Sequence, residues 1–390
     1  MEREYDLILF GATGFTGGLT AEYLAAHAPG SCRWALAGRD RAKLEAVRDR
    51  LAAINPACAG LALLHADATD RGSLDEIAAA GRVVVTTVGP YVLHGEALVA
   101  ACARNGTDYV DLCGEPEFHD STYLRHHARA KETGARLVLA CGFDSIPWDL
   151  GVYYTVKRLP KDVPLRVEAR GRINAQFSGG TFASVLTAAS RVRETISTAR
   201  ERARIQERPA GRRVRARRGK PMRDRKEGRW LVPMSTVDPQ VVVRSAAALE
   251  EYGPDFTYSQ YVSIRRLSTV AGMAAGIAAV GVLAQIAPAR RALGRLVKPG
   301  QGPSAQRRAR SSFKVRLIGE GGGQRVVTEV AGGDPGYDET AKMLSESALC
   351  LAFDSLPDTG GQLTPAAAMG DALLARLVDA GLVFRVVPPA

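Results

Sequence analysis

The fold is decided by the stretch Tyr5-Asp-Leu-Ile-Leu-Phe10-Gly11-Ala-Thr-Gly14-Phe-Thr-Gly17, close to the start of the printed sequence. A strand-like run leads directly into three glycines, and a helix-like stretch follows them. In such a turn the first glycine lets the chain leave the strand, the second lets a pyrophosphate approach the backbone, and the third lets the helix pack closely. Backbone N–H groups and the positive end of the helix dipole then face the phosphates. The stretch therefore predicts a dinucleotide-binding turn.

Strand-like runs and helix-like stretches alternate up to about residue 150. The runs are rich in Val, Leu and Ile without polar alternation, as expected for strands buried on both faces of a parallel sheet. They are Tyr5–Phe10, Arg33–Ala37, Leu61–His65, Val83–Val88, Tyr109–Leu112 and Leu137–Cys141. Such strands, joined by helical crossovers, predict an α/β protein with an N-terminal Rossmann domain, a doubly wound parallel sheet.

The second half has strand-like runs with polar alternation, which predicts an α+β domain with a mostly antiparallel sheet. The runs are Leu165–Ile173, Val241–Val243, Phe256–Ile264, Phe313–Ile318 and Arg325–Ala331. We therefore expect a Rossmann domain (1–151), a substrate and dimerisation domain (152–345) and C-terminal helices (346–390) that pack back near the first domain. Thr364 is the expected N-cap of the last long helix, with Pro365 at its first position.

The end of the second strand indicates which dinucleotide is bound. An NAD enzyme usually places Asp or Glu there to accept a hydrogen bond from the ribose, whereas this chain has Gly38 and Arg39. A guanidinium pairs with a 2′-phosphate and stacks on adenine. This favours NADP over NAD. Asp40 is the one residue of this turn that favours NAD, although it also fits the N-cap of the next helix.

Ligands of a doubly wound sheet bind beyond the carboxyl ends of the strands, where three polar, glycine-punctuated loops are expected. The loops are Thr86–Gly95, Asp111–Glu115 and Cys141–Gly151. Asp67, after the third strand, fits an adenine contact or a helix cap. The residues assigned to the cofactor are Gly11, Thr13, Gly14, Phe15, Thr16, Gly17, Gly38, Arg39, Asp67, Val88, Gly89 and Pro90.

Three residues of these loops are candidates for catalysis. Tyr91 is the preferred proton donor, with Asp144 and Ser145 as positioning or relay groups. Each has a second interpretation, because Tyr91 also fits packing under a nicotinamide and the other two also fit helix capping. A histidine acid would have to be His94 or His119.

The net charge of +11 comes from one segment. Between Arg191 and Trp230 there are 16 Lys/Arg and 5 Asp/Glu, which accounts for the whole excess. Its densest part, 208–229, mixes arginines with Pro and Gly and lacks an aromatic residue for base stacking, which disfavours nucleic acid. We interpret it as a solvated, partly disordered insertion or, alternatively, as a docking patch for an acidic partner or anionic headgroups. The six scattered cysteines have no zinc-ligand spacing, and no metal site is predicted.

The stretch 269–287 contains no charged residue and is flanked by arginine pairs on both sides. Three interpretations remain open for it: a buried or dimer-interface helix, a helix that faces a membrane surface or an acyl chain, and a membrane span. Ala and Gly dominate its composition, which makes insertion into a bilayer only weakly favourable.

Taken together, several motifs resemble the saccharopine dehydrogenase-like oxidoreductases, and among them the trans-acting enoyl reductases of polyketide lipid biosynthesis. The motifs are Gly11–Gly17, Ala37-Gly38-Arg39, Thr87-Val-Gly-Pro-Tyr91, Cys141-Gly-Phe-Asp-Ser-Ile-Pro147, Ser178-Gly-Gly-Thr181 and Leu363-Thr-Pro-Ala-Ala-Ala-Met-Gly370. The glycine turn is shared by many families, whereas the motifs from Cys141 and from Leu363 are far more specific. The resemblance spans nearly the whole chain.

The resemblance implies NADPH-dependent reduction of a carbon–carbon double bond in an acyl chain held by an acyl carrier protein or a polyketide synthase. Two alternatives are an amino-acid reductase resembling saccharopine dehydrogenases and a non-catalytic NADP-binding scaffold at membranes or lipid bodies. The chain opens without the basic and apolar regions of a signal peptide. We therefore expect a cytoplasmic protein. A peripheral contact with the inner face of the membrane through 269–287 and a homodimer are both compatible with the open interpretations of that stretch.

Overall fold

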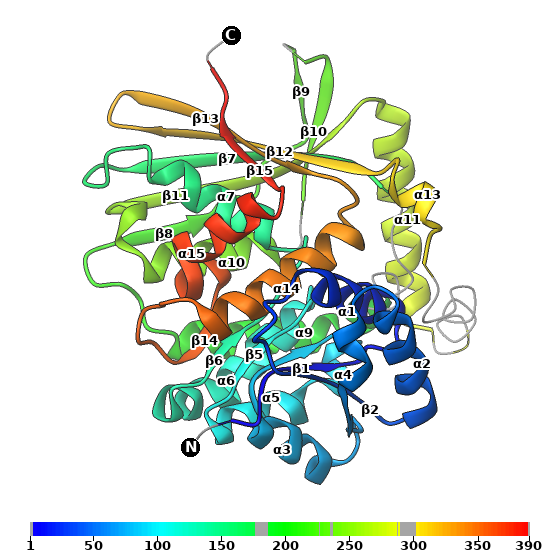
Figure 1. Cartoon of the computed structure of the whole chain (residues 1–390). Helices are drawn as coiled ribbons and strands as arrows, with labels where there is room; N and C mark the ends of the chain where they lie inside the picture. Colours follow the sequence, from blue (N-terminus) through cyan, green and yellow to red (C-terminus); the bar gives the residue numbers. More distant parts are fainter. Residues whose placement is uncertain are drawn as a thin grey trace.

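The computed structural model describes residues 3–175, 186–225, 227–234, 237–286, 288 and 302–388. Two sheets lie on either side of a layer of helices (Figure 1). Within the described residues the first sheet has seven strands, all parallel, in the order β14-β6-β5-β4-β1-β2-β3. They are β1 (Tyr5–Phe10), β2 (Trp34–Gly38), β3 (Ala62–His65), β4 (Gly81–Thr86), β5 (Asp108–Val110), β6 (Arg136–Val138) and β14 (Gly361–Leu363).

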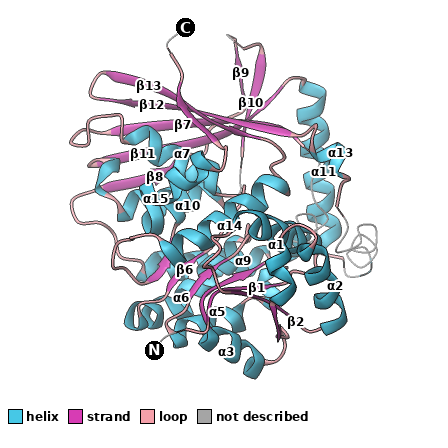
Figure 2. Ribbon diagram, in the orientation of Figure 1, coloured by secondary structure: helices cyan, strands magenta, loops and turns pink. Residues whose placement is uncertain are grey.

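Helices cover both faces of the first sheet, which confirms the predicted doubly wound fold (Figure 2). The side chains of Leu7 and Leu9 point to one buried cluster and those of Ile8 and Phe10 to another. The strand order reverses between β1 and β4, and at such a switch point a crevice opens for a ligand. The helices of this region are α1 (Phe15–His27), α2 (Arg41–Ala52), α3 (Arg71–Ala80), α4 (Tyr91–His94), α5 (Glu96–Asn105) and α6 (Pro116–Thr133), with a 3-10 turn at Pro56–Gly60.

The second sheet has eight strands in the described part of the chain, with five antiparallel and two parallel pairings. The strands are β7 (Leu165–Asn174), β8 (Arg213–Ala216), β9 (Met222–Asp224), β10 (Arg229–Pro233), β11 (Asp255–Ile264), β12 (Ser312–Gly321), β13 (Gln324–Gly332) and β15 (Val383–Val386). Along β7 buried and accessible residues alternate, as expected for a sheet with one covered face.

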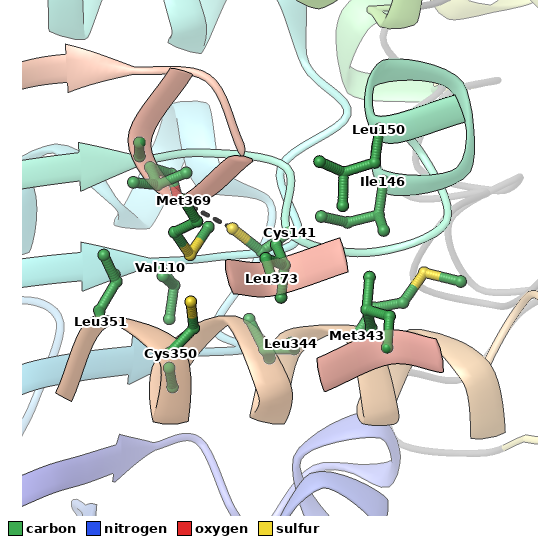
Figure 3. Close-up of a cluster of buried hydrophobic side chains, with 14 of the residues drawn as sticks. Val110, Cys141, Ile146, Leu150, Met343, Leu344, Cys350, Leu351, Met369 and Leu373 are labelled. Carbon is green, nitrogen blue, oxygen red and sulfur yellow. Dashed lines mark hydrogen bonds between the residues drawn. The ribbon is translucent and has the colours of Figure 1, made fainter. Parts of the chain in front are cut away.

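A shared core joins the two sheets. It lies around α7 (Ile146–Val156), α14 (Asp338–Phe353) and α15 (Pro365–Asp379), whose apolar side chains interdigitate in Figure 3. Trp148 of α7 is fully buried, and its indole lies so close to Gly171 of β7 that any side chain there would collide with it. Thr364 caps α15 by accepting a hydrogen bond from the Ala367 N–H, as predicted.

Two expectations about the second half are wrong. Val241–Val243 belong to a helix, α10 (Asp238–Ala248), because Val242 and Ala246 bury one helical face against the core. Within the described residues, the 208–229 segment is not disordered where it contributes β8, β9 and the start of β10 to the second sheet. The C-terminal part divides between the sheets, with β14 beside β6 and β15 beside β13.

The apolar stretch forms α11 (Leu267–Ala284), which stands at one side of the molecule in Figure 1. The side chains of Leu267, Ala271, Ala275, Ala279 and Leu283 are exposed along one stripe, whereas Ala284 is buried. These positions do not support a helix buried within this chain. In the described part of the molecule, no helix has both the length and the apolar character needed to cross a bilayer. The remaining helices are α9 (Val192–Ile205) and α13 (Ala305–Arg308).

Candidate active site

The glycine turn has the geometry that a dinucleotide needs. Gly11 has a φ of +102°, a conformation that residues with a side chain rarely adopt, and its carbonyl accepts a hydrogen bond from the Gly14 N–H at 3.0 Å. A side chain at Gly17 would run into the Gly11 carbonyl and the Thr87 hydroxyl. The third glycine therefore lets α1 approach the strand, as predicted from its spacing.

The N-terminus of α1 is open to an anion. Gly14 caps it without a side-chain hydrogen bond, and the first turn carries no acidic residue. The unpaired N–H groups and the helix dipole together favour a phosphate at this end. The aromatic ring of Phe15 packs edge-on against Tyr337 at 4.8 Å, which ties the start of the helix to the second half of the chain.

The end of β2 resolves the roles of its charged residues. Asp40 caps α2 by accepting a hydrogen bond from the Lys43 N–H at 3.1 Å, so it acts as the capping residue. Arg41 pairs with Glu45, whereas Arg39 is exposed and has no ion-pair partner in the described part of the chain. Its guanidinium is therefore available for a 2′-phosphate.

Asp67 forms a local turn instead of capping a helix. Its carboxylate accepts hydrogen bonds from the N–H and the hydroxyl of Thr69, which lower its pKa, and the charge of Arg39 acts in the same direction. The cap of α3 is Asp70. Asp67 and Arg39 thus lie near each other after β3 and β2, on the side where an adenosine would lie.

Tyr91 lies beneath the loop that follows β4. Its side chain is 5% exposed, its hydroxyl donates to the Thr86 carbonyl at 3.3 Å and accepts from the Leu112 N–H at 3.2 Å. Burial raises the pKa of this phenol well above its ordinary value. Both partners are backbone groups, which favours the interpretation that Tyr91 positions the loops.

Two buried carboxylates that sequence reasoning left without a role hold the same loops together. Glu115 accepts hydrogen bonds from the N–H groups of Tyr91 and Val92 at 3.0 and 2.9 Å, so it joins the loop after β5 to the start of α4. Asp111 accepts from the Tyr109 hydroxyl and from backbone N–H groups of Cys113 and Ala140, and burial raises its pKa to about 7. The only signal in the sequence was the polar loop Asp111–Glu115 itself.

Asp144 occupies the edge to which these loops lead. Water reaches its side chain, yet the surrounding protein raises the pKa of its carboxyl to about 6 by desolvation. A side chain at Gly114 would meet this carboxylate at 2.9 Å, so the loops after β5 and β6 converge here. Among the predicted residues Asp144 best fits a proton donor at neutral pH.

Ser145 is the residue before α7, and its hydroxyl is fully buried without a hydrogen-bond partner in the described structure. It makes no side-chain cap, so simple helix capping does not explain it. Unpaired buried hydroxyls cost free energy and usually have a reason. Because this hydroxyl bonds to no carboxylate in the described structure, the predicted positioning or relay role beside Asp144 stays a prediction.

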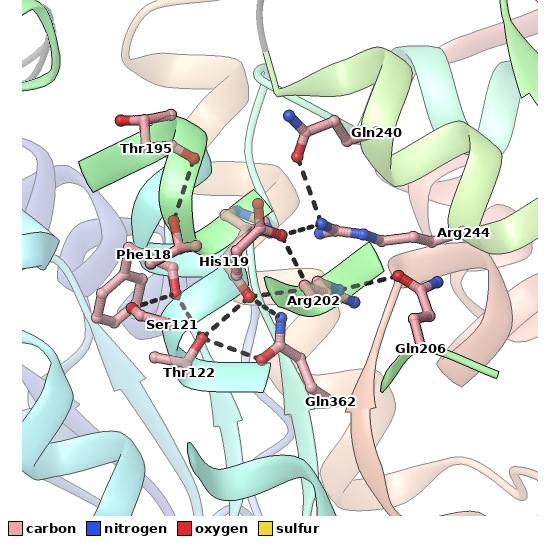
Figure 4. Close-up of polar contacts among 12 residues, drawn as sticks. Phe118, His119, Ser121, Thr122, Thr195, Arg202, Gln206, Gln240, Arg244 and Gln362 are labelled. Carbon is pink, nitrogen blue, oxygen red and sulfur yellow. Dashed lines mark hydrogen bonds and ion pairs between the residues drawn. The ribbon is translucent and has the colours of Figure 1, made fainter. Parts of the chain in front are cut away.

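One of the two candidate histidines, His119, is poorly placed for proton donation. His119 is buried, its Nε2 lies 2.9 Å from the Cys113 carbonyl, and burial lowers its pKa to about 3. It belongs to the polar cluster of Figure 4, where Arg202 of α9 and Arg244 of α10 both pair with Asp120 of α6. This cluster fastens the second half of the chain onto the Rossmann domain. His94 is exposed on α4.

The structure describes only part of the chain, which limits what it says of the Ser178–Thr181 motif and of metal ligands. The Ser178–Thr181 motif lies outside the described residues. Within those that are described, no group of three or more His, Cys, Asp or Glu side chains is arranged to hold a metal ion.

A parallel sheet with a glycine turn, an open helix N-terminus and an exposed, unpaired arginine after β2 is typical of an NADP-binding domain of the Rossmann type. In agreement, residues 7–138 match the family model of the saccharopine dehydrogenase NADP binding domain. The chain is 37% identical to a trans-acting enoyl reductase of Mycobacterium ulcerans, over 98% of this chain and 97% of that protein. A trans-acting enoyl reductase of Mycobacterium tuberculosis is 38% identical over 98% of both chains.

The fold has a solved counterpart. Apo saccharopine dehydrogenase (L-Glu forming) from Saccharomyces cerevisiae superposes with a TM-score of 0.56 over 98% of this chain and 100% of that chain, at 14% identity. This likeness shows the fold alone. The family is shown by the sequence relatives and the family model. The chain belongs to the saccharopine dehydrogenase-like oxidoreductases, in the group that contains the trans-acting enoyl reductases. The chain is therefore an oxidoreductase with NADP as its cofactor.

Proposed function

We propose that this reductase reduces the carbon–carbon double bond of an α,β-unsaturated acyl thioester carried on another protein. The observation that carries the proposal is the place of Asp144, an accessible carboxyl where the loops after β5 and β6 converge, at the same edge of the sheet as the glycine turn. The names of the relatives support the reaction class, because they are called enoyl reductases and cover the same length of chain.

In this proposal the cofactor is held by the turn Gly11–Gly17 and by Arg39. The turn fits because its glycines leave the backbone bare and the N-terminus of α1 has no side chain that competes for the phosphates. Thr13, Phe15, Thr16, Gly38, Asp67 and the Val88–Pro90 loop complete the binding surface. When bound, NADPH supplies the hydride that reaches the β-carbon of the substrate.

The proton at the α-carbon comes from Asp144. A carboxyl with a pKa of about 6 keeps part of its protons near neutrality, whereas an ordinary exposed carboxyl would have lost nearly all of them. Ser145 follows Asp144 directly, but its buried hydroxyl has no hydrogen-bond partner in the described structure, so the proposal gives it no part in the proton transfer. Tyr91 and Glu115 fix the loop between the cofactor and the substrate.

An apolar substrate is favoured over an amino acid by the surroundings. The exposed apolar helix α11 follows β11 with only Arg265 and Arg266 between them. The end of β11 is the same end of the second sheet at which Phe313 packs on Phe143, next to Asp144. An acyl chain gains free energy by covering such apolar surface, whereas a charged amino acid does not.

The proposal is tested by mixing the purified protein with NADPH and a trans-2-enoyl thioester of a small thiol. Loss of the absorbance of reduced nicotinamide together with a saturated thioester product is the expected result. Turnover of an imine formed from an amino acid, but not of the enoyl thioester, would favour the amino-acid reductase. Tight NADPH binding without turnover of any such substrate would favour the scaffold.

A further inference from the structure

The most concentrated positive charge of the molecule lies on an edge of the second sheet. We call it the basic edge and define it by six exposed side chains of β8, β9 and their flanking loops. These are Arg213, Arg217, Arg218, Lys220, Arg223 and Arg225. None of the six has a carboxylate partner in the part of the chain that the structure describes, so their charges are uncompensated.

Elsewhere on the same sheet the cations are paired. Arg170 pairs with Glu168 and with Asp224, and Arg172 pairs with Glu227. Farther along, Glu329 is the partner of Lys314, Arg316 and Arg385. Within the described residues, many cations of this sheet therefore have a nearby carboxylate, whereas the six that define the basic edge do not. Like charges in close array repel one another and destabilise the folded chain unless an anion is present.

The basic edge is also held in a fixed shape. Arg212 donates hydrogen bonds to the carbonyls of Ala246, Leu249 and Gly253 at 2.7 to 3.1 Å, which anchors the start of the segment. Gly219 lies against the Tyr261 ring so closely that a side chain there would overlap the hydroxyl. A disordered tail would spread its charges over many conformations, whereas this segment presents them on a folded surface.

The hairpin of β9 and β10 stands at the end of the sheet that leads to Asp144. Trp230 pairs with Ile264 at the end of β11, and the neighbouring strands bring Ile173 and Phe313 to this same end. Arg265, just before α11, and Arg172 lie close enough to Arg229 for their charges to lower its pKa, although desolvation is the larger cause. Positive charge thus continues from the basic edge toward the apolar helix.

We propose that the basic edge is the docking surface for an acidic acyl carrier domain, which delivers its acyl chain toward α11 and Asp144. The proposal rests on the proposed function, since it names the partner that holds the thioester. Charge complementarity supports a carrier, because carrier surfaces are typically acidic and opposite charges steer and orient the encounter. A second copy of this chain is disfavoured as the occupant, because two such edges would repel each other.

The test compares two substrates that carry the same trans-2-enoyl chain. One is a bacterial acyl carrier protein loaded with the chain, and the other is the thioester of a small thiol. In the test variant four cations become acidic: Arg217→Glu, Arg218→Glu, Lys220→Glu and Arg223→Glu. We expect kcat/KM for the carrier substrate to fall about tenfold or more at low salt, and to rise with salt in the variant where it falls with salt in the wild type, while kcat/KM for the small thioester stays within about twofold.

A matched control places the same number of reversals on the Rossmann domain, at exposed cations of α3 and α6. They are Arg71→Glu, Arg125→Glu, Arg129→Glu and Lys131→Glu. This control should reduce both substrates like the wild type, and NADPH affinity should be unchanged in both variants, which shows that they are folded.

Two results overturn the docking proposal while leaving the proposed function intact: equal loss on both substrates, or full activity of the edge variant on the carrier substrate. Sedimentation of the wild type, but not of the edge variant, with phosphatidylglycerol vesicles, combined with unchanged carrier kinetics, assigns the edge to a lipid surface instead. Failure of the wild type on both substrates contradicts the proposed function itself.

Discussion

The two sheets of this molecule differ in how many of their faces are covered by other parts of the chain. The sheet covered on both faces carries the proposed reaction site, and the sheet covered on one face carries the proposed docking surface. The first sheet is parallel, buried on both faces, and its polar loops gather at one edge. The second is mixed, with one face on the shared core and the other lined by charged side chains. A doubly covered sheet holds backbone and buried carboxylates in place, whereas a one-sided sheet is free to present charge to a partner.

The glycine turn of the first sheet offers the largest expected effect. Gly17→Val places a side chain against the Gly11 carbonyl and the Thr87 hydroxyl, so the turn and α1 have to move apart. We expect NADPH affinity to fall by about 100-fold or more, because the phosphate-binding N–H groups are displaced. Isothermal titration calorimetry measures this. Gly30→Ala is the control, since nothing lies near that position, and an unchanged affinity for Gly17→Val would contradict the assigned turn.

A substitution of Asp144 tests whether the proton is donated at the same edge of the first sheet at which the glycine turn binds the cofactor. Asp144→Asn should lower kcat by about 100-fold, the usual contribution of a general acid, and should leave NADPH affinity unchanged. In the wild type the active protonated form is complete below its raised pKa of about 6 and is lost as the pH rises above that value. A pH profile of kcat/KM should therefore fall on the alkaline side, and this limb should vanish in Asp144→Asn. Full activity of the variant removes Asp144 from the mechanism.

Arg39 sharpens the choice of cofactor. Arg39→Ala should weaken NADPH binding about tenfold and leave NADH binding unchanged, because one charge-assisted hydrogen bond to the 2′-phosphate is lost. The matched control is Arg41→Ala, whose guanidinium is already paired with Glu45. Equal weakening of both dinucleotides would show that Arg39 does not read the phosphate.

Tyr91 gives the smallest expected effect. In Tyr91→Phe the Leu112 N–H loses its acceptor, which should lower the free energy of unfolding by about 1 kcal/mol. Turnover should stay within about twofold if the hydroxyl only positions the loops. Denaturant unfolding and steady-state kinetics measure the two quantities. Lost turnover at unchanged stability would instead make Tyr91 the proton donor.

Local signals explain which parts of this account the sequence could predict. The glycine turn, the strand Tyr5–Phe10 and the cap at Asp40 each depend on residues adjacent in the chain, and each is found where it was expected. Contacts between residues far apart in the chain decide the elements that the sequence does not predict. The β-branched run at Val241 favours a strand, but burial of one helical face overrode that preference. The three residues of β14 become a strand only by pairing with β6.

The site shows the same division. Asp144 stands in a conspicuous loop, but its raised pKa comes from burial that no local motif encodes. Glu115 is remote in sequence from the Tyr91 and Val92 N–H groups that it binds, so its role appears only in three dimensions. The sequence shows the arginines of the basic edge as a run of positive charge. It does not show that the segment forms the strands β8 and β9, which pair with β11 and β10.

Isotope tracing tests the central claim most directly. The enoyl thioester is reduced once with NADPH deuterated at C4 of the nicotinamide and once with ordinary NADPH in deuterated water, and the product is examined by NMR. The account predicts deuterium at the β-carbon from the cofactor and at the α-carbon from the solvent. Deuterium on the carbonyl carbon, or no saturated product at all, would contradict it.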